Sequence, residues 1–183
     1  YNSVLQKIHE NYYSQVLKFD HIHKDHVKTE YNYPRCIGET GGQNFHFVDS
    51  EANLDLVVEK TFNSAFGYSG QKCSACSRLY LPESMWDEFI IKIKEKINAI
   101  DKDNYGVIGA YSYYSLNATI NELKSIPSVE VFQFHENCNK TSYFISPTIV
   151  LCHDKDVSVL KDEFFGPILG VRLYKPENID QII

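Results

Sequence analysis

Cys73 is the residue of this sequence whose type and setting best suit covalent chemistry. It lies in Gly70-Gln71-Lys72-Cys73, after a glycine-bounded turn and between a predicted helix and a predicted strand. A cysteine attacks as its thiolate, and the thiolate needs an accessible, electropositive setting. A loop position is more accessible than a core position, and Lys72 and Arg78 are near in the sequence. Cys73 is therefore a candidate nucleophile.

Two further stretches carry acidic residues beside glycines. Glu39 is followed by Gly41-Gly42, and glycines allow a backbone to approach a ligand closely and a neighbouring side chain to swing. Glu39 is therefore either a loop carboxylate in water or a mobile carboxylate that acts on a ligand. Glu163 opens Glu163-Phe164-Phe165-Gly166-Pro167, which predicts a tight turn behind an aromatic ring. A thiol, a mobile carboxylate and a rigid aromatic turn are the parts needed for chemistry on an aldehyde.

The spacing Cys73-Ser74-Ala75-Cys76 leaves other functions open. A zinc site wants a second cysteine pair, and the remaining cysteines, at 36, 138 and 152, form none. A thioredoxin-like dithiol wants its motif at the start of a helix that follows a strand. Here the predicted order is helix first and strand second. The dithiol interpretation remains a weaker alternative to a single nucleophile.

Composition bounds the class of protein. The 183 residues are 43% hydrophobic and 23% charged, which is typical of a globular domain with a real core. The net charge of -6 does not fit a nucleic-acid-binding surface. No apolar run approaches the length of a membrane span. Five irregularly spaced cysteines indicate a reducing compartment rather than a disulfide framework.

Alternating strand and helix patterns predict an α/β fold with a largely parallel open sheet flanked by helices. We expect helices near residues 3–17, 53–66, 84–100 and 115–125, and strands near 44–49, 78–81, 129–134, 143–150 and 170–174. Ser84 with Asp87 resembles a capping box that opens the third helix. Pro147 should lie at an edge or a bulge.

The first 33 residues differ from the rest. Residues 1–33 are polar and rich in His and Tyr, and they predict a separate N-terminal segment, whereas residues 34–183 predict one domain. His21, His23 and His26 share no face of a regular helix or strand and have no cysteine nearby, so we expect no metal site. The last residues, Glu177 to Ile183, read as the first turn of a helix that is cut short, and we expect the chain to be part of a longer one.

The three stretches together resemble the signatures of the aldehyde dehydrogenase superfamily, in the same order. These are Glu39-Thr40-Gly41-Gly42, Gly70-Gln71-Lys72-Cys73 and Glu163-Phe164-Phe165-Gly166-Pro167. The longer strings Gly38 to Phe47 and Gly70 to Tyr80 are most similar to the members that oxidise glutamate γ-semialdehyde. The resemblance begins near Tyr33, and it implies that residues 34–183 are part of a catalytic domain.

The resemblance implies a role for five residues. Cys73 would attack the aldehyde and form a thiohemiacetal and then a thioester, and Glu39 would activate the water that releases glutamate. The backbone N–H of Cys73 would supply half of an oxyanion hole. Ser74 would contact the substrate carboxylate. Glu163 would hold the nicotinamide ribose of NAD, and Phe165 would pack beside the nicotinamide.

The resemblance also implies the wider setting, which is proline degradation by a homo-oligomeric enzyme. Such enzymes lie in the mitochondrial matrix in eukaryotes, and we otherwise expect a cytoplasmic one. The family's cofactor domain lies mostly before the region matched, and no G-x-G-x-x-G motif occurs in the sequence. We therefore expect this chain alone to be inactive. The alternatives are a dehydrogenase for another aldehyde and a non-catalytic module with a degenerate dehydrogenase domain.

Overall fold

The computed structural model describes residues 6–7, 10, 37–38, 40–101, 105–135 and 143–181. The chain divides into two units, Tyr1–Thr40 and Gly41–Ile183. Most of the first unit lies outside the described residues, and so do the predicted histidine cluster and Glu39. Of the helix predicted near 3–17, Gln6, Lys7 and Glu10 are described and helical, with Gln6 donating a hydrogen bond to Glu10.

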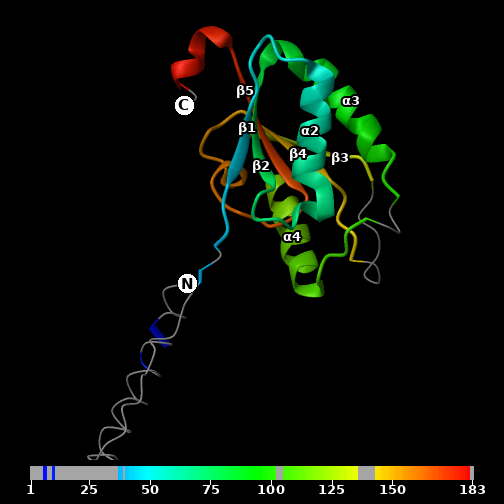
Figure 1. Ribbon diagram of the computed structural model, residues 1–183, viewed down its shortest axis with the longest axis vertical. Helices are drawn as coiled ribbons and strands as arrows, with labels where there is room; N and C mark the ends of the chain where they lie inside the picture. Colours follow the sequence, from blue (N-terminus) through cyan, green and yellow to red (C-terminus); the bar gives the residue numbers. More distant parts are fainter. Residues whose placement is uncertain are drawn as a thin grey trace, which may run out of the picture. The chain divides into compact units, whose positions relative to one another are not determined.

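The second unit is built on a five-stranded sheet in the order β1-β2-β5-β4-β3 (Figure 1). The strands are β1 (Asn44–Phe47), β2 (Cys76–Pro82), β3 (Val129–Gln133), β4 (Thr148–Cys152) and β5 (Ile168–Tyr174). The strands β1, β2, β5 and β4 run parallel to one another, and the edge strand β3 pairs with β4 in the antiparallel direction. The predicted α/β fold with a largely parallel open sheet is confirmed.

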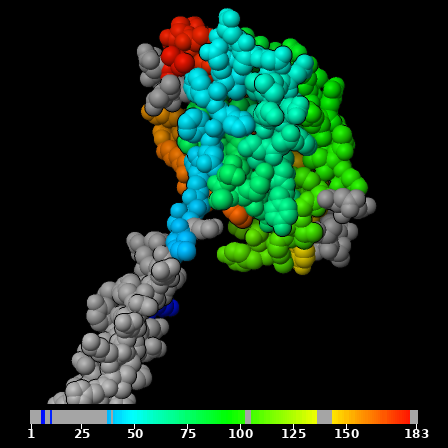
Figure 2. All heavy atoms as spheres, in the orientation of Figure 1, coloured from blue at the N-terminus to red at the C-terminus, as the bar shows by residue number. Residues whose placement is uncertain are grey.

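Two helices, α2 (Leu54–Phe66) and α3 (Trp86–Asn98), cover one face of this sheet. Their buried residues Phe66, Phe89 and Ile93 pack in one cluster with the sheet residues Ile149 and Leu169. Because successive residues of a strand point to opposite faces, this cluster lies on one side only. In the space-filling view, residues from β1 through α3, coloured cyan to green, cover much of the face turned to the viewer (Figure 2).

The helix α4 (Ala110–Leu123) covers the opposite face. Its buried residues Leu116 and Ile120 pack with Val150 and Cys152 of β4, the strand positions that alternate with those under α2 and α3. The second unit therefore has three layers, with the sheet in the middle. Among the described residues, no helix is long and apolar enough to span a bilayer.

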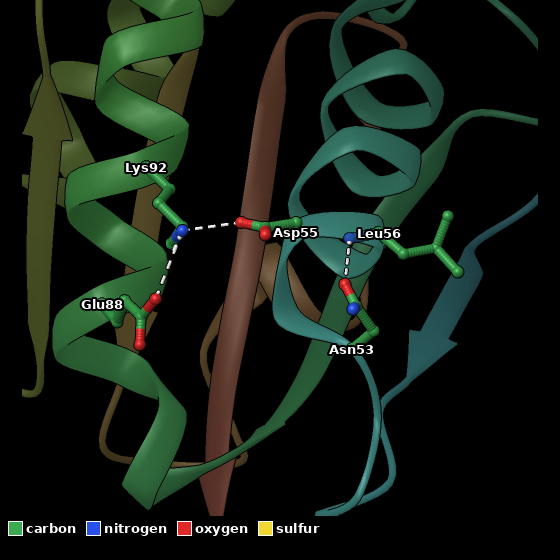
Figure 3. Close-up of polar contacts among 5 residues, drawn as sticks. All are labelled: Asn53, Asp55, Leu56, Glu88 and Lys92. Carbon is green, nitrogen blue, oxygen red and sulfur yellow. Dashed lines mark hydrogen bonds and ion pairs between the residues drawn. The ribbon is translucent and has the colours of Figure 1, made fainter.

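The N-terminus of α2 is capped and tied to α3 (Figure 3). The Asn53 side chain accepts a hydrogen bond of 3.0 Å from the backbone N–H of Leu56, which satisfies one of the free donors of the first turn. Lys92 of α3 bridges Asp55 of α2 at 2.6 Å and Glu88 of its own helix at 3.3 Å. The two ion pairs of Lys92 are exposed, so they contribute little beyond fixing how the two helices meet.

Three expectations for the elements were wrong in detail. Ser84 is not a cap: it lies in a 3-10 turn, Glu83–Met85, and α3 starts at Trp86 without a side-chain cap. The fourth predicted helix begins five residues earlier than expected, at Ala110, behind Gly109. β4 begins only at Thr148, because Pro147 lacks the N–H that a ladder needs. Pro147 therefore precedes an internal strand and lies at neither an edge nor a bulge.

Candidate active site

The fold brings the three sequence stretches to one end of the sheet, where the strands begin. Gly41-Gly42 directly precedes β1, the loop from Gly70 to Ala75 directly precedes β2, and Glu163 to Pro167 directly precedes β5. β1, β2 and β5 are neighbours and run parallel. Segments that enter parallel neighbouring strands must meet at the amino ends of those strands, so the sheet order itself assembles the site.

Cys73 occupies the second position of a tight turn. The backbone N–H of Ala75 donates to the carbonyl of Lys72 at 3.0 Å, which closes a four-residue turn around Cys73 and Ser74. Both central residues are exposed. Because the Lys72 carbonyl points into the turn, the N–H of Cys73, on the opposite side of the same trans peptide, points out of it. The exposed thiol and this outward N–H belong to the same residue of the turn.

Asn44, at the start of β1, reaches across to this turn. Its side-chain amide donates to the carbonyl of Cys73 at 2.7 Å and to the carbonyl of Ala75 at 3.2 Å. The pairing of β1 with β2 shifts here, since Asn44 lies opposite Cys76 while Phe45 lies opposite Arg78. Such an irregularity re-aims the side chain at the bulge.

The loop before Cys73 is held in an uncommon backbone conformation. Tyr68, Ser69 and Gly70 have φ values of 57°, 55° and 68°, in the left-handed region. Non-glycine residues rarely stay there unless the surroundings hold them, and such strain is frequent at functional sites. The hydroxyl of the buried Ser69 donates to the Gly106 carbonyl at 2.6 Å, and the Gln71 amide donates to the Val107 carbonyl at 2.9 Å.

The same loop touches the Phe165 turn at backbone distance. A Cβ built on Gly70 would lie 2.3 Å from the carbonyl oxygen of Gly166 and 2.9 Å from that of Ala65. No side chain fits between these backbones, so glycine is required at position 70 for space as well as for its positive φ. The predicted glycine-bounded loop and the predicted aromatic turn are therefore in direct contact.

Glu163 lies against the glycine pair that follows Glu39. Its carboxylate accepts a hydrogen bond of 3.1 Å from the N–H of Gly42. A Cβ on Gly41 would lie 1.7 Å from one of its oxygens, so a side chain at position 41 would displace the carboxylate from this position. The neighbouring Gln43 side chain donates to the Asp162 carbonyl. Glu163 itself is exposed.

Phe165 presents its ring to solvent beside Glu163. The ring is 49% exposed and its residue has a φ of 49°, so a strained backbone holds an apolar group outward. An exposed aromatic face next to a carboxylate fits a nicotinamide riboside, which offers a flat ring and ribose hydroxyls. The described residues contain no phosphate cradle to match, so they fit only this end of a dinucleotide.

The other cysteine of the motif is not available for chemistry. Cys76 is 2% exposed, and burial raises the pKa of its thiol to about 11. Cys152 is also buried, and burial raises the pKa of its thiol to about 12. Cys76 and Cys152 therefore pack as small apolar groups, whereas Cys36 and Cys138 lie outside the described residues.

The two cations near Cys73 in the sequence have partners elsewhere. Lys72 donates to the carbonyl of Asn63 in α2 at 3.4 Å. Arg78 donates to the carbonyl of Gln43 at 2.7 Å and lies 5.4 Å from the centre of the Phe45 ring. His46 of β1 is hydrogen-bonded to Thr61 at 3.1 Å, and burial lowers its pKa.

The described residues do not enclose a substrate at this place. The pocket between the Cys73 loop and the Phe165 turn has a volume of about 10 Å³, room for no more than one water molecule. A larger hollow of about 450 Å³ lies between α2 and α3, and none of its lining residues belongs to the three stretches. Within the described part of the chain, no cluster of His, Cys, Asp or Glu fits a metal ion.

Sequence reasoning anticipated the meeting of the stretches but missed the residues that tie them. Asn44 is 29 residues from its partner Cys73, and Arg78 is 35 residues from Gln43. The spacing of these residues in the sequence does not predict such contacts. Ser74 is exposed beside Cys73, as a substrate-contacting residue must be.

Comparison with known proteins places this site in a family. The model of the aldehyde dehydrogenase family matches residues 20–183. The chain belongs to the aldehyde dehydrogenase family. The match begins within the polar segment that we separated from the rest at residue 33, and it includes all three stretches.

Two similar curated proteins carry the same name. The mitochondrial Δ1-pyrroline-5-carboxylate dehydrogenase of Rattus norvegicus is 36% identical over 183 residues, which cover 92% of the chain and 32% of the relative. That of Homo sapiens is 34% identical, over 94% of the chain and 33% of the relative. The chain thus spans about a third of the length of the curated relatives it matches.

Solved structures agree with this comparison. The Δ-pyrroline-5-carboxylate dehydrogenase of Mycobacterium tuberculosis bound with NAD is 30% identical, with a TM-score of 0.71, over 83% of the chain and 29% of that structure. The 1-pyrroline-5-carboxylate dehydrogenase from Thermus with bound NAD is 28% identical, with a TM-score of 0.66, over 75% of the chain and 28% of that structure. The fold is therefore that of a part of these enzymes.

Proposed function

We propose that the protein containing this chain oxidises glutamate γ-semialdehyde to glutamate with NAD, as its relatives' name, Δ1-pyrroline-5-carboxylate dehydrogenase, implies. The observation that carries the proposal is the contact of three distant stretches around an exposed Cys73. Gly42 is bonded to Glu163, 121 residues away, Gly70 lies against Gly166, and Asn44 is bonded to Cys73. Residues 34–183 would then form part of the catalytic domain.

Cys73 is the proposed nucleophile. Its thiolate sulfur bonds to the aldehyde carbon, and the carbonyl oxygen becomes the negative oxygen of a thiohemiacetal. The outward N–H of Cys73 is placed to donate a hydrogen bond to that oxygen, which stabilises the developing charge. Oxidation of the thiohemiacetal leaves the acyl group on Cys73 as a thioester. Ser74, next in the turn, is the proposed contact for the substrate carboxylate.

Glu39 is the proposed general base of the second half-reaction. It takes a proton from water, the hydroxide adds to the thioester carbon, and the Cys73 thiolate leaves as glutamate forms. The Gly41-Gly42 pair that follows it in the sequence gives the chain the freedom that such a base needs.

Glu163 and Phe165 are the proposed contacts for NAD, which accepts hydride when bound. The exposed carboxylate of Glu163 would accept hydrogen bonds from the ribose hydroxyls, and the exposed ring of Phe165 would pack beside the nicotinamide. By the same analogy we propose a homo-oligomer that acts in proline degradation, in the mitochondrion of a eukaryote or the cytoplasm of another cell.

The test is a substrate panel on the protein as its source expresses it. We expect NADH formation with NAD and Δ1-pyrroline-5-carboxylate to exceed that with acetaldehyde or succinic semialdehyde. Cys73→Ser should lower the rate by about a thousandfold or more, because it removes the nucleophile. Cys76→Ser should retain more activity than Cys73→Ser, which separates a single nucleophile from a dithiol.

Glu39→Gln gives the sharper test of the second half-reaction. A general base that acts only on the thioester should be dispensable for the first NADH. We therefore expect a burst of about one NADH per site, followed by slow turnover. A panel with no preference for the semialdehyde, or full activity of Cys73→Ser, would refute the proposal.

A further inference from the structure

Asn44 has a geometry that its place in the sequence does not explain. The side-chain amide nitrogen of Asn44 donates to two carbonyls of the turn around Cys73, those of Cys73 at 2.7 Å and Ala75 at 3.2 Å. Its residue is otherwise exposed, at the first position of an edge strand. An asparagine there is unfavourable for a strand, so propensity does not account for it.

We propose that Asn44 is a positioning residue, which holds the Cys73 turn so that the thiol is presented in one fixed direction. The inference rests on the proposed function, since it assigns a second residue to the same site. The role of Asn44 differs from that of Cys73, because Asn44 acts through the turn and does not touch substrate.

Two bonds fix the backbone on either side of Cys73. The Ala75 N–H holds the carbonyl of Lys72 and so fixes the peptide plane before Cys73. Asn44 holds the carbonyl of Cys73 and so fixes the peptide plane after it. Two fixed planes set φ and ψ of the residue between them, and these set the direction of its Cα–Cβ bond. The thiol is then free to rotate only about its own side-chain bond.

The shift in strand pairing lets the Asn44 side chain contact the loop that precedes β2. β1 and β2 pair regularly from Phe45 and Arg78 onward, but Asn44 lies opposite Cys76, so Ser77 is passed over. This irregularity turns the Asn44 side chain onto the loop that precedes β2. Arg78 supports the same corner, because its guanidinium donates to the carbonyl of Gln43, the residue before Asn44.

The position also joins the segment of Gly41 and Gly42 to the Cys73 turn. Asn44 follows Gly41-Gly42-Gln43, the segment that continues from Glu39, and the Gly42 Cα would carry a Cβ 3.8 Å from the Cys73 carbonyl. Asn44 therefore joins the strand entered from the general-base segment to the turn of the nucleophile. Loss of the Asn44 donor should loosen the turn, although it removes none of the side chains proposed to react.

The test compares Asn44→Asp with Asn98→Asp in the protein as its source expresses it. Asp at 44 keeps the size but places a carboxylate against two carbonyl oxygens, whereas Asn98 is an exposed residue at the end of α3 and controls for the added charge. We expect amide hydrogen exchange in peptides covering residues 70–77 to become about tenfold faster in Asn44→Asp, with α3 peptides unchanged.

Steady-state kinetics separate a positioning role of Asn44 from a purely structural one, because only the positioning role predicts a selective fall in kcat. A misdirected nucleophile lowers the rate of attack more than substrate binding, so kcat should fall by about tenfold to a hundredfold while KM changes less than about threefold. Asn44→Gln, which keeps the donors on a longer side chain, should recover part of the loss. Asn44→Ala replaces Asn44→Asp if the latter does not fold.

Either of two results would overturn the role of Asn44: unchanged exchange in residues 70–77, or faster exchange with unchanged kcat. A wild-type protein that oxidises no aldehyde would instead refute the proposed function. The exchange measurement alone would then decide whether Asn44 holds the turn, so the two failures are distinguishable.

Discussion

At the scale of single residues, exposure separates the two cysteines of the motif. Cys73 lies in an exposed turn, whereas Cys76 is the first residue of β2 and faces the core. With a pKa of about 11, Cys76 has about one thiolate in a thousand molecules at pH 8. The spacing suggested a pair, but the start of a strand between them gives the two thiols opposite surroundings.

This difference predicts selective alkylation. At pH 8, iodoacetamide should modify Cys73 at least about tenfold faster than Cys76 or Cys152, because both are buried and their thiols stay protonated. The raised pKa values mean that the contrast should shrink only as the pH approaches 11. Mass spectrometry of the cysteine peptides over time measures it, and equal rates for Cys73 and Cys76 at pH 8 would contradict the structure.

The site residues show what the sequence could predict. The three stretches were identified from their residue types, and the structure brings the described parts of them into contact. Glu39 lies outside the described residues, so its place remains a prediction. Asn44 and Arg78 were missed because their partners are fixed by strand pairing, and pairing of β1 with β2 is a property of the sheet rather than of local sequence.

At the scale of elements, local signals predicted α2 better than α3 and α4. α2 has an asparagine cap, an amphipathic repeat and a glycine stop, and its observed range agrees with the prediction to one residue. α3 has no side-chain cap, and the apparent capping box at Ser84 falls in a 3-10 turn instead. The start of α4 behind Gly109 has no capping side chain that a sequence could reveal.

Asn53 caps α2 whereas Ser84 caps no helix, so we expect their substitutions to change stability by different amounts. Asn53→Ala should lower the free energy of unfolding by about 1 kcal/mol, because the N–H of Leu56 loses its acceptor. Ser84→Ala should change it by less than about 0.5 kcal/mol, since Ser84 is exposed and caps nothing. Denaturant unfolding of the two variants measures both, and an equal loss would restore the capping box that the structure rejects.

At the scale of the whole molecule, the described residues complete a sheet but do not enclose the candidate site. The order of helices and strands was enough to predict an α/β fold with a largely parallel sheet. It was not enough to predict the strand order, because β5 pairs with β2 across the chain between them. The chain spans about a third of the length of the curated relatives it matches, and the pocket between the Cys73 loop and the Phe165 turn has a volume of about 10 Å³.

These facts predict that the 183-residue chain by itself makes no NADH. The described residues offer contacts for one end of a dinucleotide and do not enclose an aldehyde, so hydride transfer should not occur. NADH formation from NAD and Δ1-pyrroline-5-carboxylate would be compared between this chain and the protein as its source expresses it. Comparable rates would show that the catalytic unit is much smaller than its relatives suggest.

The central place of β5 has a consequence for biosynthesis. Of the described strands, β5 is the last to be synthesised, yet it lies between β2 and β4 and joins the two halves of the sheet. Until it emerges, β2 and β4 each expose an unpaired edge, and such edges invite pairing with other chains. The nascent protein should therefore depend on chaperones until residue 174 has been synthesised, and a stop codon before Ile168 should give an aggregating product rather than a smaller folded one.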